Sequence, residues 1–185
     1  MIPRISTPAC TLIPFTRTHA HNPRYATWLR DRDVLLTLNL PQYLIAPVED
    51  SVLEAYCESM MAERDVWFYA LETRPHGDFV GTLKVKFDRQ PQRADLGIMI
   101  GEKRQWGKGL ASAALGAVAH YLFESEPVCK LTAGAMATNP AMIRVFEKLG
   151  FQQEGVFRQH DLIEGNRIDH VHLGCFADEL ERSGT

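Results

Sequence analysis

Residues 104–111 read Arg-Gln-Trp-Gly-Lys-Gly-Leu-Ala, and this stretch decides how the chain folds. An apolar run from Asp95 to Ile100 precedes it and an alanine-rich amphipathic segment follows it, which predicts a strand, a glycine turn and a helix N-terminus. Backbone N–H groups in the first turn of a helix have no intrahelical partner, and glycine lets a ligand approach them closely. The stretch therefore predicts an anion-binding turn, and we interpret its ligand as a pyrophosphate.

Two common phosphate-binding loops do not fit this stretch. A Walker A loop needs Gly at position 102 and Ser or Thr after its lysine, where this chain has Glu102 and Gly109. A Rossmann fingerprint that starts at Gly107 needs Gly or Ala where Ser112 stands, and the strands before the turn are hairpin strands. The turn is therefore not a P-loop and is a poor Rossmann match.

The composition indicates one globular domain over residues 1–185, with 45% hydrophobic and 23% charged residues. A formal net charge of −3 argues against bulk nucleic-acid binding. The four cysteines show neither zinc-site nor disulfide spacing, so we interpret them as reduced thiols. The N-terminus lacks a signal-peptide pattern and no apolar run has the length of a membrane span, which predicts a soluble cytoplasmic protein.

The N-terminal third predicts a short strand followed by helices. We expect residues 1–8 to be a frayed lead-in and Cys10 to Phe15 to be the first strand. Pro23 starts a helix that continues to Asp33, and the apolar stretch after it stops at Pro41.

A second N-terminal helix is expected to begin at Pro47. Its predicted apolar stripe consists of Val52, Leu53, Tyr56, Met60 and Met61. A helical pair of this kind either shapes a substrate pocket or simply packs on the core.

The middle of the chain changes to an extended period. Val66 to Leu71 and Phe79 to Phe87 predict two strands joined at a Pro75-His76-Gly77-Asp78 turn, and Ala94 to Ile100 predicts a third antiparallel strand.

After the glycine turn, the pattern predicts a strand–helix–strand crossover and hence one parallel pairing in the sheet. Leu110, Ala114, Leu115, Val118, Ala119 and Leu122 line one helix face, and Leu131, Ala133 and Ala135 alternate as a strand.

The next helix has clear start and stop signals: Asn139 as N-cap, Pro140 in the first turn and Gly150 as C-terminal stop. Two strands, Phe151 to Phe157 and Ile168 to Phe176, finish the predicted sheet around a Glu164-Gly165-Asn166 turn, and a polar tail follows.

Arg104, Gly107 and Gly109 occupy every fixed position of a short signature: Arg or Gln, two residues, Gly, one residue, then Gly or Ala. In this order of elements the sequence resembles the GNAT family of acetyl-CoA-dependent N-acetyltransferases. The block from Asn139 to Gly155 is similar to the RimJ/RimL-like branch, whose members typically carry Asn-x-x-Ser, an aromatic residue, Lys-Leu-Gly-Phe and Glu-Gly. The resemblance covers about Trp67 to Phe176.

The expected fold class is α/β of the α+β type. A mixed, mostly antiparallel central sheet of six to seven strands would contain one splayed parallel pair, with helices on both faces.

The resemblance also implies where acetyl-CoA, the cosubstrate, would bind. Backbone groups of the strand before the signature would pair with the pantetheine arm, and the glycine turn would wrap the pyrophosphate. Lys108 would add a modest electrostatic contribution, or would be a solvated loop lysine. The implied contacts are Ile98, Met99, Ile100, Arg104, Gln105, Trp106, Gly107, Lys108, Gly109, Leu110, Ala111, Asn139, Met142 and Phe146.

Direct attack of a neutral amine on the thioester carbonyl requires a proton acceptor and an oxyanion donor. A backbone N–H near Met99 is the expected donor. Many relatives have Ser where Met142 stands or Tyr where Phe146 stands, and neither residue here can donate a proton. Acid assistance then comes from water or is unnecessary.

Asp161 is the preferred base, because RimL-like members resemble this chain in placing a carboxylate there. His160 is the alternative, since adjacent strand residues face opposite sides and only one of the two can point inward. A polar turn near Glu164 would account for both residues equally well. Asp95 and Glu72 are weaker candidates, and Asn139 contributes beside the thioester.

His170 and His172 share one strand face, which is a pattern that a metal site would use. No third ligand has suitable spacing, so we interpret them as ordinary sheet histidines and expect no metal.

The predicted function is transfer of acetyl to a primary amine. Residues 97–101, 106–109 and 130–134 look like members that acetylate nucleotide-linked amino sugars or other small amines. A protein N-terminal (ribosomal-protein-like) acetyltransferase and a non-catalytic acyl-CoA-binding module are the alternatives. A peptide acceptor predicts an open groove beside the Asn166 turn, and a nucleotide sugar predicts a deeper polar pocket. The expected partner is a small amine or a peptide N-terminus, without nucleic acid or membrane, for a monomer or homodimer.

Overall fold

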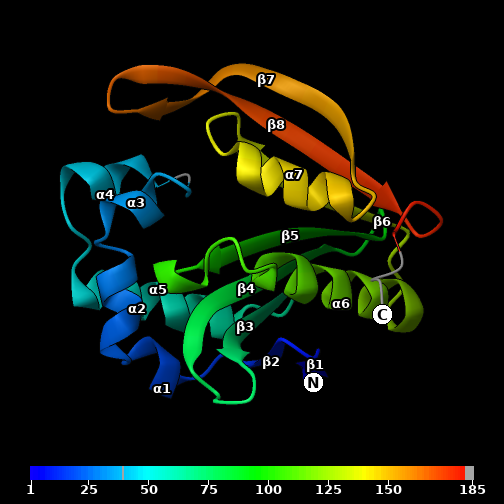
Figure 1. Cartoon of the computed structure of the whole chain (residues 1–185), viewed down its shortest axis with the longest axis horizontal. Coiled ribbons are helices and arrows are strands. Elements are labelled where there is room, and N and C mark those ends of the chain that lie inside the picture. The colour runs from blue at the N-terminus through cyan, green and yellow to red at the C-terminus, as the bar shows by residue number, and fades with distance from the viewer. Residues whose placement is uncertain (39, 182–185) are drawn as a thin grey trace.

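A computed structural model describes residues 1–38 and 40–181 of the chain. Its centre is an eight-stranded sheet in the order β1-β2-β3-β4-β5-β6-β8-β7 (Figure 1). The strands are β1 (Ile5–Ser6), β2 (Cys10–Pro14), β3 (Val66–Thr73), β4 (Phe79–Asp88), β5 (Arg93–Ile100), β6 (Lys130–Met136), β7 (Gln152–Ile163) and β8 (Asn166–Phe176). β5 and β6 are parallel and the other neighbouring strands are antiparallel, which confirms the expected mixed sheet.

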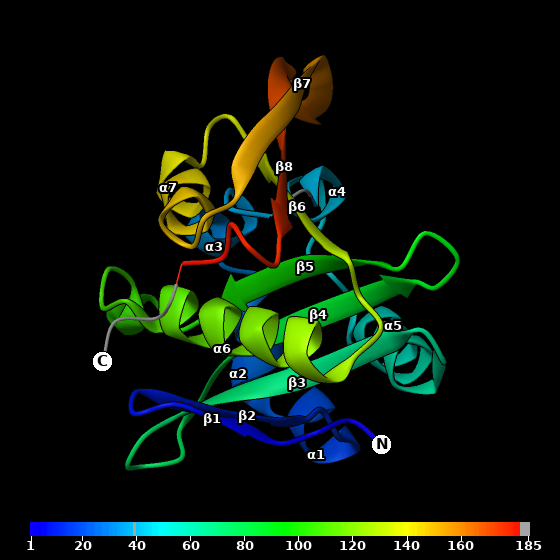
Figure 2. The same ribbon diagram turned by 90° about the vertical axis from the view of Figure 1, so that its right-hand side faces the viewer.

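The helices occupy both faces of this sheet, as expected. They are α1 (Arg17–Ala20), α2 (Pro23–Trp28), α3 (Arg32–Leu35), α4 (Pro41–Ile45), α5 (Asp50–Ala62), α6 (Leu110–Ser125) and α7 (Pro140–Lys148), with a 3-10 helix, η1 (Lys103–Gln105). Figure 2 shows α6 crossing β3, β4 and β5 on one side, with α5 on the other. None of the helices in the described ranges is long and apolar enough to cross a membrane.

Alternation along β3 separates two hydrophobic cores, because successive side chains of a strand point to opposite faces. Tyr69 and Leu71 pack in the core that contains α6, whereas Phe68 and Ala70 pack in the core that contains α2 and α5. The central strands are thus buried on both faces, which explains the nearly continuous apolar run at their start.

The two strands of the parallel pair diverge. Their ladder runs from Arg93 opposite Lys130 to Leu96 opposite Ala133 and then stops. Beyond that point β5 stays paired with β4 up to Ile100, and β6 stays paired with β8 up to Met136. The sheet therefore opens between the C-terminal halves of β5 and β6.

The N-terminal lead-in was predicted wrongly, since it contains β1. Ile5 is buried in the first core and pairs with Leu12. Thr7 holds the intervening turn, because its side chain accepts from the Cys10 N–H at 2.9 Å and its own N–H donates to the Cys10 carbonyl. The described sheet therefore has one strand more than the six to seven expected.

The helix expected from Pro23 to Asp33 is split, because a new capping residue intervenes. α2 does begin at Pro23, but α3 restarts where the Asp31 carboxylate accepts from the Asp33 N–H at 2.9 Å. At Pro41, where the pattern predicted a stop, α4 begins.

The start of α5 also differs from the prediction, because the helix begins at Asp50 and not at Pro47. The Arg30 guanidinium donates to the Val48 carbonyl at 2.9 and 3.1 Å, and this pairing holds the preceding turn outside the helix. The predicted stripe is partly wrong as well. Val52 and Tyr56 are 47% and 40% exposed, whereas Leu53 and Cys57 face the core.

The β7–β8 hairpin carries a bulge. Its register shifts between Phe157 and Asp161, and Gln159 there has a φ of 54° with its N–H bonded to Asp169 Oδ1 at 2.7 Å. The tip of the hairpin reaches α3, where Arg32 Nη2 lies 2.9 Å from Glu164 Oε2. Figure 1 shows this hairpin extending over α3 and α4.

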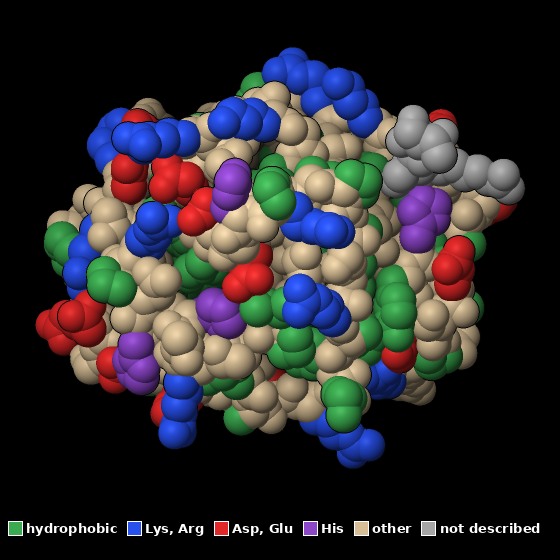
Figure 3. Space-filling view, turned by 60° about the horizontal axis from the view of Figure 1, so that its bottom comes forward, with side chains coloured by type: hydrophobic (Ala, Val, Ile, Leu, Met, Phe, Trp, Pro, Cys, Tyr) green, Lys and Arg blue, Asp and Glu red, His purple; other side chains and the backbone are tan. Residues whose placement is uncertain are grey.

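The surface carries charges of both signs. On the face in Figure 3, basic side chains gather along the upper edge, while acidic and basic side chains are interspersed over the rest. This distribution agrees with the small net charge of −3.

Candidate active site

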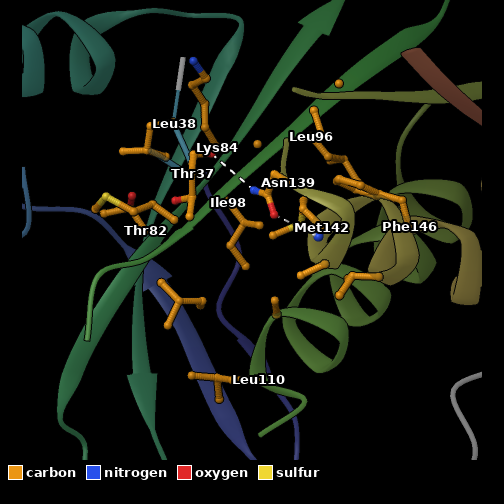
Figure 4. A pocket seen from close by; sticks show the side chains of 18 of the residues that line it. Thr37, Leu38, Thr82, Lys84, Leu96, Ile98, Leu110, Asn139, Met142 and Phe146 are labelled. Atoms are coloured by element: carbon orange, nitrogen blue, oxygen red, sulfur yellow. Dashed lines mark hydrogen bonds between the residues drawn. The ribbon is translucent and has the colours of Figure 1, made fainter. Parts of the chain in front are cut away.

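A cleft of about 1220 Å³ occupies the opening between β5 and β6 (Figure 4). Its walls come from β4, β5, the loop that follows β5, α6, β6, α7 and β8, and the N-terminal helices cover one end. The predicted cofactor contacts that line it are Ile98, Met99, Ile100, Gln105, Trp106, Gly107, Gly109, Leu110, Ala111, Asn139, Met142 and Phe146.

The glycine turn has the geometry that an anion requires. Gly107 and Gly109 have φ values of 73° and 77°, and Gly109 is the N-cap of α6. A Cβ added to either glycine would meet nothing within 4 Å, so the space above the turn is open. The unpaired N–H groups at the start of α6 and this open space fit a pyrophosphate.

The loop around the turn is fixed by side chains. Trp106 Nε1–H donates to the Ile100 carbonyl at 2.7 Å, and Glu102 accepts from the Arg104 N–H at 3.4 Å. Lys103 Nζ lies 2.7 Å from Asp31 and 2.8 Å from Asp33, and the hydrogen bond to Lys103 lowers the pKa of Asp31. The loop is thus tied both to β5 and to α3.

Two predicted phosphate contacts lie outside the cleft lining. Arg104 lines a separate pocket of about 180 Å³ with Arg24, Asp78 and Glu102, and Lys108 is an exposed loop residue. The structure thus places backbone N–H groups, more than these cations, at the proposed pyrophosphate position.

Asn139 is the N-cap of α7, as predicted. Its Oδ1 accepts from the Met142 N–H at 3.2 Å and its Nδ2 donates to the Thr37 carbonyl at 3.4 Å (Figure 4). This residue therefore links the start of α7 to the N-terminal region at the wall of the cleft. Phe146 is almost fully buried, so its ring packs in the core beside the cleft.

Asp161 is buried, with 4% of its surface exposed, and its Oδ2 lies 2.6 Å from Nδ1 of His170. His160 is exposed, and its ring centroid lies 5.8 Å from that of His170. As expected for adjacent strand positions, only one of the two side chains is buried, that of Asp161. The bulge between Phe157 and Asp161 nevertheless brings the exposed His160 ring near His170.

Two histidines that the sequence pattern indicates only as ordinary sheet residues, His170 and His172, line the cleft. His172 Nε2 is buried and has no hydrogen-bond partner among residues 1–38 and 40–181. Burial lowers the pKa of His172, and the neighbouring imidazoles of His170 and His160 lower it further. The sequence pattern that could have indicated these residues is their spacing of two positions on β8, the strand that pairs with β6.

Asp95 and Lys84 are the charged groups on the adjoining strands. Burial raises the pKa of Asp95, against the hydrogen bond that Thr132 donates at 2.9 Å and the nearby Lys84 ammonium. In the described part of the chain, Lys84 has no ion pair within 4.0 Å. Glu72 lies outside the cleft lining, 3.9 Å from His19 Nε2.

The part of the cleft that the N-terminal region and β3 line is mainly apolar and aromatic. Its lining consists of Tyr25, Leu29, Thr37, Leu38, Leu40, Tyr43, Leu53, Tyr56 and Phe68. No group of three His, Cys, Asp or Glu side chains arranged to hold a metal occurs in the ranges 1–38 and 40–181.

The sequence of the chain matches one known protein family. The family model described as "Acetyltransferase (GNAT) domain" matches residues 10–152. The chain is 37% identical over 76 residues to [ribosomal protein uS5]-alanine N-acetyltransferase of Escherichia coli, covering 41% of this chain and 39% of that protein. It is 26% identical over 135 residues to L-amino acid N-acetyltransferase AaaT of the same species, covering 65% and 83%.

Among solved structures, spermidine N-acetyltransferase from Vibrio cholerae in complex with CoA and spermine has a TM-score of 0.80 at 17% identity, covering 92% of this chain and 96% of that one. At this identity the similarity shows the fold alone. The alignments with the first curated relatives cover about half of their length, 46% and 50%.

Proposed function

The chain belongs to the GNAT acetyltransferase family, and from this membership we propose that it transfers the acetyl group of acetyl-CoA to a primary amine of a small molecule. One observation carries the proposal: a glycine turn and the N-terminus of α6 lie at the mouth of a cleft opened by the divergence of β5 and β6. Bound there, acetyl-CoA would supply an activated acetyl thioester. The open backbone of β5 beyond Leu96 would receive its pantetheine arm by strand-like pairing.

The covered end of the cleft supports a small acceptor. The ion pair between Arg32 and Glu164 joins α3 to the β7–β8 turn, across the space that an open peptide groove would use. Since this end is also lined by apolar and aromatic groups, we propose a compact amine with an apolar or ring-shaped body.

Lys84 supports an acceptor that also carries negative charge. A half-buried ammonium without an ion-pair partner in the described chain favours an anionic ligand group. Nucleotide-linked amino sugars and amino acids both meet this requirement, whereas a polyamine does not. The name of the relative AaaT, an L-amino acid N-acetyltransferase, agrees with the second class.

The test is thiol release from acetyl-CoA with four amine classes: nucleotide-linked amino sugars, L-amino acids, spermidine and peptides with free N-termini. We expect release with one of the first two classes and a higher KM for that amine in Lys84→Gln. Best turnover with peptides would instead support the protein N-terminal alternative. Tight CoA binding without release with any amine would support the binding-module alternative, which the non-donating Met142 and Phe146 keep open.

Membership of the RimJ/RimL-like branch is proposed on the Asn139 to Gly155 block and on the partial similarity to the uS5-alanine acetyltransferase. We also propose a single domain over residues 1–185 that acts in the cytoplasm. Limited proteolysis and light scattering would test the domain and distinguish a monomer from a homodimer.

A further inference from the structure

We propose that His170, oriented by Asp161, is the base that takes the proton from the acceptor amine. The inference rests on the proposed acetyl transfer, and it moves the role of proton acceptor from the Asp161 carboxylate to its imidazole partner. Asp161 becomes a positioning residue, since it is buried behind His170 and lies outside the cleft lining.

The hydrogen bond between the two side chains sets the tautomer of His170. A carboxylate can only accept, so over the 2.6 Å contact with Asp161 Oδ2 the Nδ1 atom must carry the hydrogen. The other ring nitrogen, Nε2, then keeps its lone pair. This is the arrangement in which a buried carboxylate prepares a histidine to accept a proton.

The free nitrogen of His170 lies over the opened part of β6. A Cβ added to Gly134 would lie 2.5 Å from His170 Nε2, so the ring occupies the space that a side chain at position 134 would fill. Gly134 follows Ala133, the last residue of β6 that pairs with β5, and it lines the cleft. Nε2 therefore lies at the wall of the opening where the thioester would be received.

The other titratable groups nearby are less suited to the role. On β8, His172 has no carboxylate partner for its buried Nε2 among the described residues, and burial lowers its pKa. On β7, His160 is exposed and lies outside the cleft lining. Asp95 of β5 accepts from Thr132 of β6, and Lys84 of β4 is a cation that lacks a free lone pair at neutral pH.

The reaction balances with one base. The acceptor ammonium gives one proton to His170 Nε2, and its nitrogen then forms the C–N bond to the acetyl carbon as the C–S bond breaks. The nitrogen loses a second proton, which the departing sulfur takes up, so the products are an N-acetyl amine and a free thiol. His170 returns its proton to water.

The first measurement uses the full chain with acetyl-CoA and the best amine from the panel. His170→Gln, whose amide can still donate to Asp161, is expected to lower kcat/KM by about 10²- to 10⁴-fold and to remove the acidic limb of the pH profile. CoA affinity, measured by calorimetry, should stay within about twofold because the substitution leaves the glycine turn intact. Imidazole should restore part of the activity of His170→Ala.

Matched controls separate this role from a structural one. His76→Gln changes an exposed turn histidine and Asp178→Asn an exposed carboxylate, and both should keep wild-type turnover. Asp161→Asn should lower kcat with little change in KM and should alter the pH profile, because the tautomer of His170 is no longer fixed.

A second measurement does not depend on turnover. ¹⁵N NMR of the histidine side chains, assigned by loss of a signal in His170→Gln, should show His170 as the Nδ1–H tautomer at neutral pH. An Nε2–H tautomer overturns the assignment whether or not the protein is active. Wild-type release that persists in His170→Gln overturns the base alone, whereas no release by wild type with any amine overturns the proposed function together with the base.

Discussion

Gly134 and His170 show, at the scale of single residues, how a missing side chain can shape a site. The ring of His170 occupies the space beside Gly134 that a β-carbon would need. A glycine in the interior of a strand weakens that strand, and the close approach of the His170 ring explains why glycine is nevertheless present at position 134.

Gly134→Ala is therefore expected to displace the His170 ring. Because proton transfer depends on the position of Nε2, kcat should fall by at least about tenfold while CoA affinity stays near wild type. Steady-state kinetics and calorimetry check both values. Gly155→Ala on β7 is the matched control, because a Cβ there would meet nothing within 4 Å. Equal kinetics in the two variants would contradict the expectation.

Asp95 makes the stability of the fold depend on pH. Its pKa is raised in the folded state by burial, so the folded chain binds more protons than the unfolded chain just above the usual carboxyl range. Stability from this residue is therefore present at low pH and is lost as pH rises through that window.

Asp95→Asn should remove this loss, so that the free energy of unfolding of the variant no longer falls as pH rises through that window. Urea unfolding of both proteins at several pH values measures the difference. A difference that does not change with pH would contradict the assignment.

The sequence predicted single residues well where the signal was local. The side chain of Asn139 caps α7 by accepting from the N–H of Met142, which is only three residues later. A short sequence pattern is therefore enough to predict this cap. The pairing of Asp161 with His170 crosses two strands, and its register depends on the bulge at Gln159. A pattern of neighbours along the chain cannot reveal such a partner, and for this reason the two cleft histidines were interpreted as ordinary sheet residues.

At the scale of elements, the N-terminus of α6 depends on backbone that only glycine adopts easily. Gly109, with a φ of 77°, and Gly77, with a φ of 73° in the β3–β4 turn, have nearly the same conformation and equal open space. Alanine at either position should therefore cost about 1–2 kcal/mol of stability. Only Gly109→Ala should also weaken CoA binding, because its Cβ enters the proposed phosphate position. Urea unfolding and calorimetric titration compare the two variants, and equal CoA affinities would contradict the placement.

The cap of α7 can be divided into its two hydrogen bonds. Asn139→Ala loses both and should cost about 1 kcal/mol, which lowers Tm by about 2–4 °C for a chain of this size. Asn139→Asp keeps the oxygen that accepts from Met142 but loses the donor to Thr37. We expect it to retain most of the stability while acceptor binding weakens. Thermal unfolding and KM give the two readouts.

Helices and strands could be predicted from the sequence where the turn and capping residues agreed with the spacing of the apolar residues. The β3–β4 hairpin, α6 and α7 follow the predicted ranges closely. The N-terminal region was harder because tertiary contacts decide it: Arg30 holds the turn before α5, and Ile5 gains its strand by pairing with Leu12. Neither contact leaves a periodic pattern in the sequence.

For the whole molecule, the ion pair between Arg32 and Glu164 joins segments 132 positions apart in the sequence. Both side chains are about half exposed, so the pair should contribute no more than about 1 kcal/mol to stability. Its effect should appear in acceptor binding. Arg32→Glu and Glu164→Arg are each expected to raise KM for the amine several-fold, whereas the double exchange restores it.

The exposed pair of Arg17 and Glu58, between α1 and α5, is the matched control for this charge exchange. Its exchange should leave KM unchanged. Single variants of Arg32 or Glu164 that unfold, or that leave KM unchanged, would contradict the closing role of the pair.

The region around α3 contacts three other segments of the chain: η1, the start of α7 and the β7–β8 turn. Asp31 and Asp33 hold Lys103 beside the glycine turn, the carbonyl of Thr37 accepts from Asn139 at the start of α7, and Arg32 reaches Glu164. We therefore expect that binding of the acyl donor beside the glycine turn, which would restrict the motion of α3, also changes the affinity for the amine. Such linkage is reciprocal, so each substrate should raise the affinity for the other by the same factor. Through α3, the protein would bind the amine tightly only when the acyl donor is already bound.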